Sequence, residues 1–328
     1  MRVMVTGATG FVGRAIVREL AVAGHDVTAL VRGPNAEERL DIGERPVTVV
    51  EGALDARRAL AAALDGRDTV VHAAALVDPV RQGDEAAVFR TNRDAAVELG
   101  TLALRTGVRR FVFVSSIAAM GFYSGLMTST SPCRPETAYG RAKLEAEQAL
   151  LALSIPSFDV VVLRLPTVYG PGEKYNFLAW TRAVDRGLFR LIGDGSNVMP
   201  LCTTANAARA VRGAVDGRLE SGIFLVADAE PYYLARIHRA ILAALGRREP
   251  RLRIPLPLAR AAGFVNEVAS SRVPLVPLVL SRARVRTLTV NQTFDVRSLV
   301  RAGIELDAPL EEWVGRTVED YRGRGLVD

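Results

Sequence analysis

Short apolar runs alternate with amphipathic stretches through the first half of the chain. Apolar runs bounded by polar residues are typical of strands that are buried on both faces of a parallel sheet. Such runs are found at 2–6, 27–31, 47–50, 69–72, 110–115 and 160–165. Helical patterns lie between them, for example at 14–23, 55–64, 85–106 and 139–153. This alternation predicts an α/β fold with a Rossmann-type, doubly wound parallel sheet.

The alternation breaks after Gly172, where a helical pattern at 176–187 is followed by a turn-rich segment at 190–197. A helix at 206–215 and a strand at 223–227 then have the pattern of elements that return to the main sheet. We therefore expect residues 1–172, together with 201–227, to form the Rossmann domain. Residues 173–200 and 228–328 are expected to form a smaller, discontinuous C-terminal domain that binds the substrate. Its proline-rich apolar stretch after Pro250 either covers a lipophilic pocket or packs against the sheet.

A glycine-rich turn joins the first predicted strand to the first predicted helix. The sequence from Gly7 to Gly13 is Gly-Ala-Thr-Gly-Phe-Val-Gly. In this context Gly7 permits a tight turn, Gly10 lets backbone amides approach a pyrophosphate, and Gly13 allows the helix to pack closely on the strand. The turn therefore predicts a dinucleotide site at the helix N-terminus.

Tyr139 and Lys143 are four residues apart in a predicted helix, so they share one face. Among the 42 lysine and arginine residues of the chain, only Lys143 and Lys174 are lysine. An arginine-biased chain would use arginine where positive charge alone was needed, so lysine at this position indicates a specific requirement. The ammonium is expected to lower the pKa of the phenol and to prepare it for proton transfer. A chance spacing on a solvated helix is the alternative.

These two motifs resemble those of the extended short-chain dehydrogenase/reductase family. Thr6 to Gly13 matches its TGxxGxxG fingerprint and Tyr139 to Lys143 matches its YxxxK motif. Other similar segments are 70–75, Thr91-Asn92, 111–116, and 162–172, which resembles the family's RPxxVYGPG block. The resemblance implies that Tyr139 exchanges the proton of the substrate oxygen, that Lys143 assists it and holds the nicotinamide ribose, and that Ser116, or alternatively Ser115, binds the substrate oxygen.

The same resemblance implies a set of cofactor-binding residues. They are Gly7, Thr9, Gly10, Phe11, Val12, Gly13, Arg32, Leu54, Ala73, Ala74, Lys143, Pro166 and Val168. NADP is expected in preference to NAD, because the second strand ends in Val31-Arg32 where an NAD site usually has an acid, and a guanidinium can bind a 2′-phosphate. One departure concerns the adenine contact, since Ala53-Leu54 stands where the family often has Asp-Leu.

The composition narrows the class of protein. A chain of 328 residues with 49% apolar content can bury a large core. Cys133 and Cys202 lack metal-ligand spacing, so we expect no metal, a reducing compartment and a cytoplasmic location. We also expect no signal peptide, no transmembrane segment and, despite a net charge of +6, no nucleic-acid partner, because the arginines are scattered. His72 is expected in the core, His25 in a turn and His238 on a surface helix.

The second domain bears on the substrate class. Sugar-nucleotide enzymes of the resembling family commonly have an arginine after a glycine turn in this domain, whereas this chain has Met199 after the Gly195 turn. The segment 192–197 and Asn206 are similar to the branch of 3β-hydroxysteroid and sterol dehydrogenases and 2-alkyl-3-oxoalkanoate reductases. We therefore expect an NADP-dependent oxidoreductase that interconverts a secondary alcohol and a ketone on a lipophilic small molecule.

Two alternatives remain open from the sequence. One is a sugar-nucleotide epimerase, dehydratase or ketoreductase of the same superfamily. The other is a non-catalytic NADP-binding protein on the same fold, which the complete Ser/Tyr/Lys set disfavours. The resemblance also implies a homodimer formed through the helices at 85–106 and 139–153.

Overall fold

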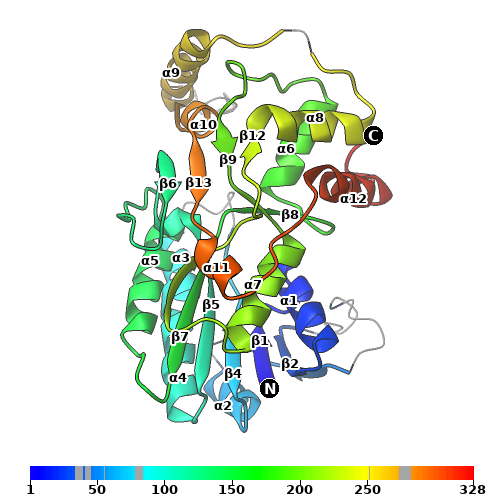
Figure 1. The fold of residues 1–328 in the computed structure, drawn as a ribbon. Coiled ribbons are helices and arrows are strands. Elements are labelled where there is room, and N and C mark those ends of the chain that lie inside the picture. The colour runs from blue at the N-terminus through cyan, green and yellow to red at the C-terminus, as the bar shows by residue number, and fades with distance from the viewer. Residues whose placement is uncertain (34–39, 41–45, 55, 78–83, 251, 273–281) are drawn as a thin grey trace.

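The computed structural model describes residues 1–33, 40, 46–54, 56–77, 84–250, 252–272 and 282–328. Within these residues the main sheet has seven parallel strands in the order β11-β7-β5-β4-β1-β2-β3 (Figure 1). The strands are β1 (Arg2–Thr6), β2 (Asp26–Val31), β3 (Thr48–Glu51), β4 (Thr69–His72), β5 (Arg110–Ser116), β7 (Asp159–Leu165) and β11 (Gly222–Leu225). The order reverses between β1 and β4, as in the doubly wound sheet that the sequence predicts.

Helices cover both faces of this sheet because its strands are apolar on both sides. On one face, α1 (Phe11–Val22) and α7 (Thr204–Val215) pack against alternate residues such as Val3 and Val5. On the other face, α2 (Arg57–Leu64), α4 (Ala95–Arg105) and α5 (Ala138–Leu151) bury Met4 and its neighbours. Successive side chains of a strand point to opposite faces, so one buried strand supplies both cores.

The predicted helix at 85–106 is interrupted. It consists of α3 (Glu85–Phe89), a π-helical turn η1 (Arg90–Asp94) and α4. Asn92 lies in the π turn and is buried. Its amide donates to the carbonyl oxygens of Leu76 (3.1 Å) and Val88 (3.0 Å), and its oxygen accepts from the Leu76 amide (3.0 Å). The π-helical turn therefore places Asn92 where its side chain fixes the segment after β4. The helical periodicity of the sequence does not reveal this interruption.

A second group of elements lies above the carboxyl ends of the strands (Figure 1). Helices α6 (Asn176–Asp185), α8 (Leu234–Leu245) and α12 (Leu310–Gly323) share a hydrophobic cluster. The remaining elements are η2 (Ile117–Ala119), β6 (Gly125–Met127), β8 (Thr167–Tyr169), β9 (Val198–Met199), β10 (Leu201–Thr203), β12 (Tyr232–Tyr233), α9 (Leu256–Arg272), α10 (Arg282–Thr287), β13 (Gln292–Phe294) and α11 (Arg297–Arg301).

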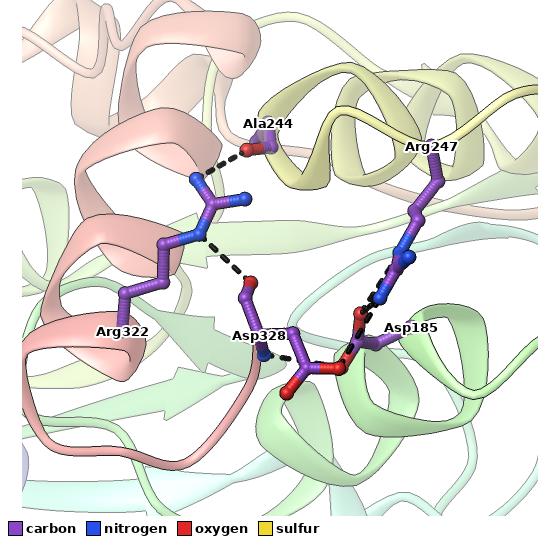
Figure 2. Close-up of polar contacts among 5 residues, drawn as sticks. All are labelled: Asp185, Ala244, Arg247, Arg322 and Asp328. Atoms are coloured by element: carbon purple, nitrogen blue, oxygen red, sulfur yellow. Dashed lines mark hydrogen bonds and ion pairs between the residues drawn. The ribbon is translucent and has the colours of Figure 1, made fainter.

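Asp328 forms polar contacts that connect α6, α8 and α12 (Figure 2). Arg322 on α12 donates to the carbonyl oxygens of Ala244 (3.0 Å) and Asp328 (2.8 Å). Arg247 after α8 forms ion pairs with Asp185 on α6 (2.9 Å) and with Asp328 (3.3 Å). Polar contacts thus surround the apolar cluster and fix the positions of α6, α8 and α12.

The expectation that His238 lies on a surface helix is wrong. Its helix, α8, packs against both α6 and α12, and the residue is only 1% exposed. Its ring lies 5.1 Å from that of Phe189, and burial lowers the pKa of its imidazole. In the part of the chain that the structure describes, no helix is long and apolar enough to span a bilayer.

Candidate active site

A cleft of about 740 Å³ opens at the carboxyl ends of β1, β4, β5 and β7, beside the point where the strand order reverses. Ligands of doubly wound sheets bind at this place. The three proposed catalytic residues, Ser116, Tyr139 and Lys143, all line the cleft. Seven of the proposed cofactor residues line it as well, namely Gly10, Phe11, Val12, Gly13, Ala73, Pro166 and Val168.

The glycine turn has the geometry that the sequence predicts. Gly7 has a φ of +69°, and a Cβ on it would lie 2.5 Å from the amide nitrogen of Ala74. A Cβ on Gly13 would lie 2.0 Å from the carbonyl oxygen of Gly7. Both positions therefore require glycine. Helix α1 begins at Phe11 without a side-chain cap and faces the cleft, so its N-terminal amides can receive an anion such as a pyrophosphate.

Five proposed cofactor residues lie outside the described lining of the cleft. Gly7, Thr9 and Ala74 belong to the two turns that support it, and Leu54 packs into the cluster beneath the sheet. Arg32 is exposed and directly follows β2, the strand beside the edge strand β3. The following segment, 34–39, is outside the described residues. The 2′-phosphate contact of Arg32 thus stays a prediction.

Tyr139 lies in the first turn of α5. Thr137 caps this helix by accepting a hydrogen bond from the Gly140 amide (3.0 Å), which fixes where the helix begins. The Ser116 hydroxyl lies beside the phenol. Burial raises the pKa of Tyr139 to about 12, and the contact with Ser116 lowers it only in part. The expectation of a lowered tyrosine pKa is therefore wrong, because desolvation of the phenolate outweighs the other effects.

Lys143 is buried one turn further along the same face and is 1% exposed. Its Nζ donates to the carbonyl oxygen of Val114 (2.9 Å) and lies 4.4 Å from the ring centre of Phe113 and 6.0 Å from that of Tyr139. Burial lowers the pKa of Lys143 to about 7, against the charge of Glu147, which raises it. The two residues share a face as predicted, but burial makes Lys143 the more readily deprotonated of the pair.

The two candidate serines have different partners. Ser116 faces Tyr139, and its oxygen also accepts from the Ala118 amide (3.2 Å). Ser115 donates a very short hydrogen bond to the buried carboxylate of Glu147, which also binds Arg164 on β7 at 2.6 Å. Both serines line the cleft, where Ser116 lies beside Tyr139 and Ser115 is bound to the buried Glu147.

Several polar residues of the cleft were missed from the sequence. Arg141 forms an ion pair with Glu85 on α3 (3.0 Å), and Glu136 pairs with Arg286 on α10 (2.6 Å). The guanidinium of Arg286 also stacks on the Phe122 ring at 3.9 Å. The nearness of Glu136 and Arg141 to Tyr139 along the chain was a signal that could have found them. The described lining contains no residue from 254–280, so it gives no support to that segment as the cover of the pocket.

His72, expected in the core, is fully buried beneath the cleft at the end of β4. Its Nδ1 contacts the Thr6 hydroxyl (2.7 Å), and its ring stacks on Phe113 at 5.8 Å. Burial lowers the pKa of His72 to about 3, and the nearby Lys143 charge lowers it further. The imidazole is neutral at physiological pH and serves as packing, as predicted.

Comparison with known proteins identifies the family. The model of the NAD-dependent epimerase/dehydratase family matches residues 3–227. A ketoreductase of Stigmatella aurantiaca, named for 4-hydroxy-2-methyl-3-oxo-4-farnesyl-3,4-dihydroquinoline-1-oxide, is 27% identical over 314 residues and 92% of each chain. A UDP-glucose 4-epimerase of Vibrio cholerae is 29% identical over 269 residues, 78% of this chain and 79% of the relative.

A solved structure confirms the fold. The crystal structure of gox2253 superposes with a TM-score of 0.81 at 22% identity, and covers 100% of this chain and 99% of that one. The fingerprint turn, the cleft at the strand reversal and the Tyr139/Lys143 helix are thus found within the matched family region. The chain belongs to the NAD-dependent epimerase/dehydratase family and is an NAD(P)-dependent oxidoreductase.

Proposed function

We propose that this protein interconverts a secondary alcohol and a ketone on a lipophilic, steroid-like or 3-oxoacyl-like molecule, with NADP as the hydride carrier. The observation that carries the proposal is the meeting of Ser116, Tyr139 and Lys143 in one cleft with the uncapped N-terminus of α1. Apolar side chains of the same cleft, including Leu76 and Val77, suit a lipophilic substrate.

Proton transfer follows from the protonation states of the site. The bound nicotinamide supplies or accepts the hydride. Ser116 and Tyr139 bind the substrate oxygen, and Tyr139 gives it a proton when a ketone is reduced. With a pKa of about 12, Tyr139 is a phenol at neutral pH, which is the form that reduction needs. Lys143, whose pKa is about 7, holds the nicotinamide ribose and can return a proton to the phenolate.

The proposed cofactor preference rests on Arg32, the residue that follows β2, because a guanidinium at this point of a dinucleotide site can pair with a 2′-phosphate. We expect Arg32→Asp to reverse the preference for NADPH over NADH, by about tenfold or more, because a carboxylate repels the phosphate and accepts bonds from ribose hydroxyls. Fluorescence titration with both cofactors measures the ratio. Arg105→Asp makes the same charge change at the end of α4 and should leave the ratio as it is. A wild type that prefers NADH would refute the role of Arg32.

The proposal of a lipophilic substrate is supported by three arginines that could have bound a nucleotide diphosphate. Each of them donates a hydrogen bond to a backbone carbonyl oxygen instead. These arginines are the candidates to replace the arginine that is absent after the Gly195 turn. Arg182 donates to the carbonyl oxygen of Leu326, Arg190 to those of Gly187 and Phe189, and Arg253 to that of Asp194. None of the three is in the described lining of the cleft. Met199 packs against the apolar cluster of α6, α8 and α12.

Ligand binding tests this substrate class. A diphosphate that binds without a cationic partner loses charge-assisted hydrogen bonds worth about 1.5 to 3 kcal/mol each, so we expect UDP and dTDP to bind weakly or not at all. A steroid-like or long-chain ketone loses nothing there and should bind. Calorimetry on the NADP-loaded protein compares the ligands, and a screen of NADPH oxidation with ketosteroids, 3-oxoacyl compounds and keto-sugar nucleotides adds turnover. Micromolar binding of either diphosphate contradicts the proposal.

The second candidate is a sugar-nucleotide epimerase, dehydratase or ketoreductase. The similarity to a UDP-glucose 4-epimerase over 78% of the chain favours it. The two functions share the hydride and proton chemistry of the cleft and differ in what binds beside it, so the calorimetry above separates them.

We further propose that the chain forms a homodimer through α3, α4 and α5, which lie side by side on one face of the sheet. These helices carry half-buried apolar side chains outside the core clusters, among them Val97 and Leu144. Light scattering at micromolar concentration should give twice the mass of the chain, about 71 kDa from 35.4 kDa per chain. Replacing Val97 with Glu should give the monomer mass. A wild type that is monomeric at this concentration rules the dimer out.

A further inference from the structure

The ionisable groups around Lys143 come from three elements, α5, β7 and β4. Glu147 follows it by one turn of α5, and Arg164 on β7 binds that carboxylate through Nε (3.1 Å) and Nη2 (2.6 Å). His72 on β4 is neutral because burial lowers its pKa to about 3. Tyr139 is neutral as well. Among the described neighbours, Glu147 is therefore the anionic group near the ammonium, and it is 0% exposed.

Three consecutive residues of β5 contact three residues spaced by four along α5. The carbonyl oxygen of Val114 accepts from Lys143, the Ser115 hydroxyl donates to Glu147, and the Ser116 hydroxyl lies beside the Tyr139 phenol. The spacing places all three helix residues on one face. The Glu147 carboxylate thus binds Ser115 at the end of β5. Ser115 lies between Val114, which contacts Lys143, and Ser116, which lies beside Tyr139.

We propose that Glu147 is a positioning residue of the proton-transfer site, whose negative charge keeps the Lys143 ammonium protonated while its bond to Ser115 holds the end of β5. The inference rests on the proposed function of Tyr139 and Lys143. An ammonium that is buried without a counter-charge releases its proton, because burial disfavours the charged form. Arg164 pairs with the same carboxylate, so loss of Glu147 would also leave the Arg164 guanidinium buried without its partner.

A purely structural role of Glu147 predicts a different outcome. The ion pair with Arg164 would then stabilise the fold and have no effect on the titration of Lys143. The two roles are separable because the chain contains only two lysines, Lys143 and Lys174. Lys174 is exposed and outside the described lining of the cleft. In a Lys174→Arg background, a protein labelled with carbon-13 at lysine Cε gives one lysine signal, and its pH titration reports Lys143 alone.

In that background we expect Glu147→Gln to lower the titration midpoint of Lys143 by about one pH unit, because the negative charge that raises the pKa of Lys143 has been removed. Ser115→Ala keeps the carboxylate and removes one of its hydrogen bonds, so the midpoint should stay within about 0.3 pH unit of wild type. Glu147→Gln leaves Arg164 buried and unpaired, which threatens folding. The double variant Glu147→Gln/Arg164→Met removes both charges of the pair, so its midpoint should also lie below that of wild type but fall less than in Glu147→Gln, because the Arg164 cation has gone as well.

An unchanged midpoint in the folded Glu147 variants overturns the proposal, and so does an equal fall in Ser115→Ala. Turnover supplies a second readout, since activity that needs protonated Lys143 should fall at neutral pH in Glu147→Gln and recover as the pH is lowered towards 6. A loss that is equal at every pH argues for the structural role. The lysine titration does not depend on any substrate, so it decides the role of Glu147 even if the protein turns over no lipophilic ketone, an outcome that would refute the proposed function alone.

Discussion

Tyr139→Phe should reduce ketone turnover by about 10²-fold to 10⁴-fold while the affinity for NADPH stays close to that of wild type. The substitution removes the phenolic hydroxyl, which lies beside Ser116, but keeps the ring in its buried site. Because phenylalanine keeps the ring and alters neither the unfolded state nor the packing much, the free energy of unfolding should also remain similar. Steady-state NADPH oxidation measures the first effect, and fluorescence titration with NADPH measures the second.

Tyr123→Phe provides a matched control, because it removes a hydroxyl from a half-buried tyrosine that is outside the described lining of the cleft. Its turnover should equal that of wild type. If Tyr139→Phe retains the wild-type rate, the assignment of Tyr139 as proton donor fails. If it loses NADPH affinity to the same extent as turnover, the residue holds the cofactor rather than the proton.

Lys143→Met should abolish turnover and at the same time stabilise the protein at acidic pH. Below about pH 7 the folded and unfolded states both carry the ammonium, so the cost of burying the charge is present in full. Between about 7 and the ordinary value of 10.5 the folded state alone has released its proton, and the cost declines as the pH rises. Methionine removes this cost but leaves the Val114 carbonyl oxygen without its donor.

The balance of these effects gives a gain in the free energy of unfolding of about 1 to 3 kcal/mol near pH 6, which should shrink towards pH 10. Denaturant titrations at several pH values measure it. Lys143→Arg should also be severely impaired, since a bulkier guanidinium stays charged in a site that is 1% exposed, and it should show no such gain. A Lys143→Met protein that is less stable than wild type at pH 6 would show that the ammonium is not destabilising there.

The parts of this protein that the sequence determines are those governed by local geometry. Buried strands and amphipathic helices have different periods, and their alternation was enough to predict the doubly wound sheet that is observed. The glycine turn was equally readable, because the positive φ of Gly7 and the missing Cβ of Gly13 are requirements of the backbone itself. The shared face of Tyr139 and Lys143 follows from helical spacing alone.

Only the tertiary structure decided which protonation states that shared face carries. Spacing suggested that Lys143 would lower the pKa of Tyr139, but the free energy of desolvating a charge depends on what packs around it, and burial sets both values. The bond between Ser115 and Glu147, and the burial of His238 between two helices, likewise depend on residues brought together from distant parts of the chain. The spacing of residues along a helix or strand determines which side chains share a face. Tertiary packing determines what surrounds those side chains, and therefore their pKa values and charges.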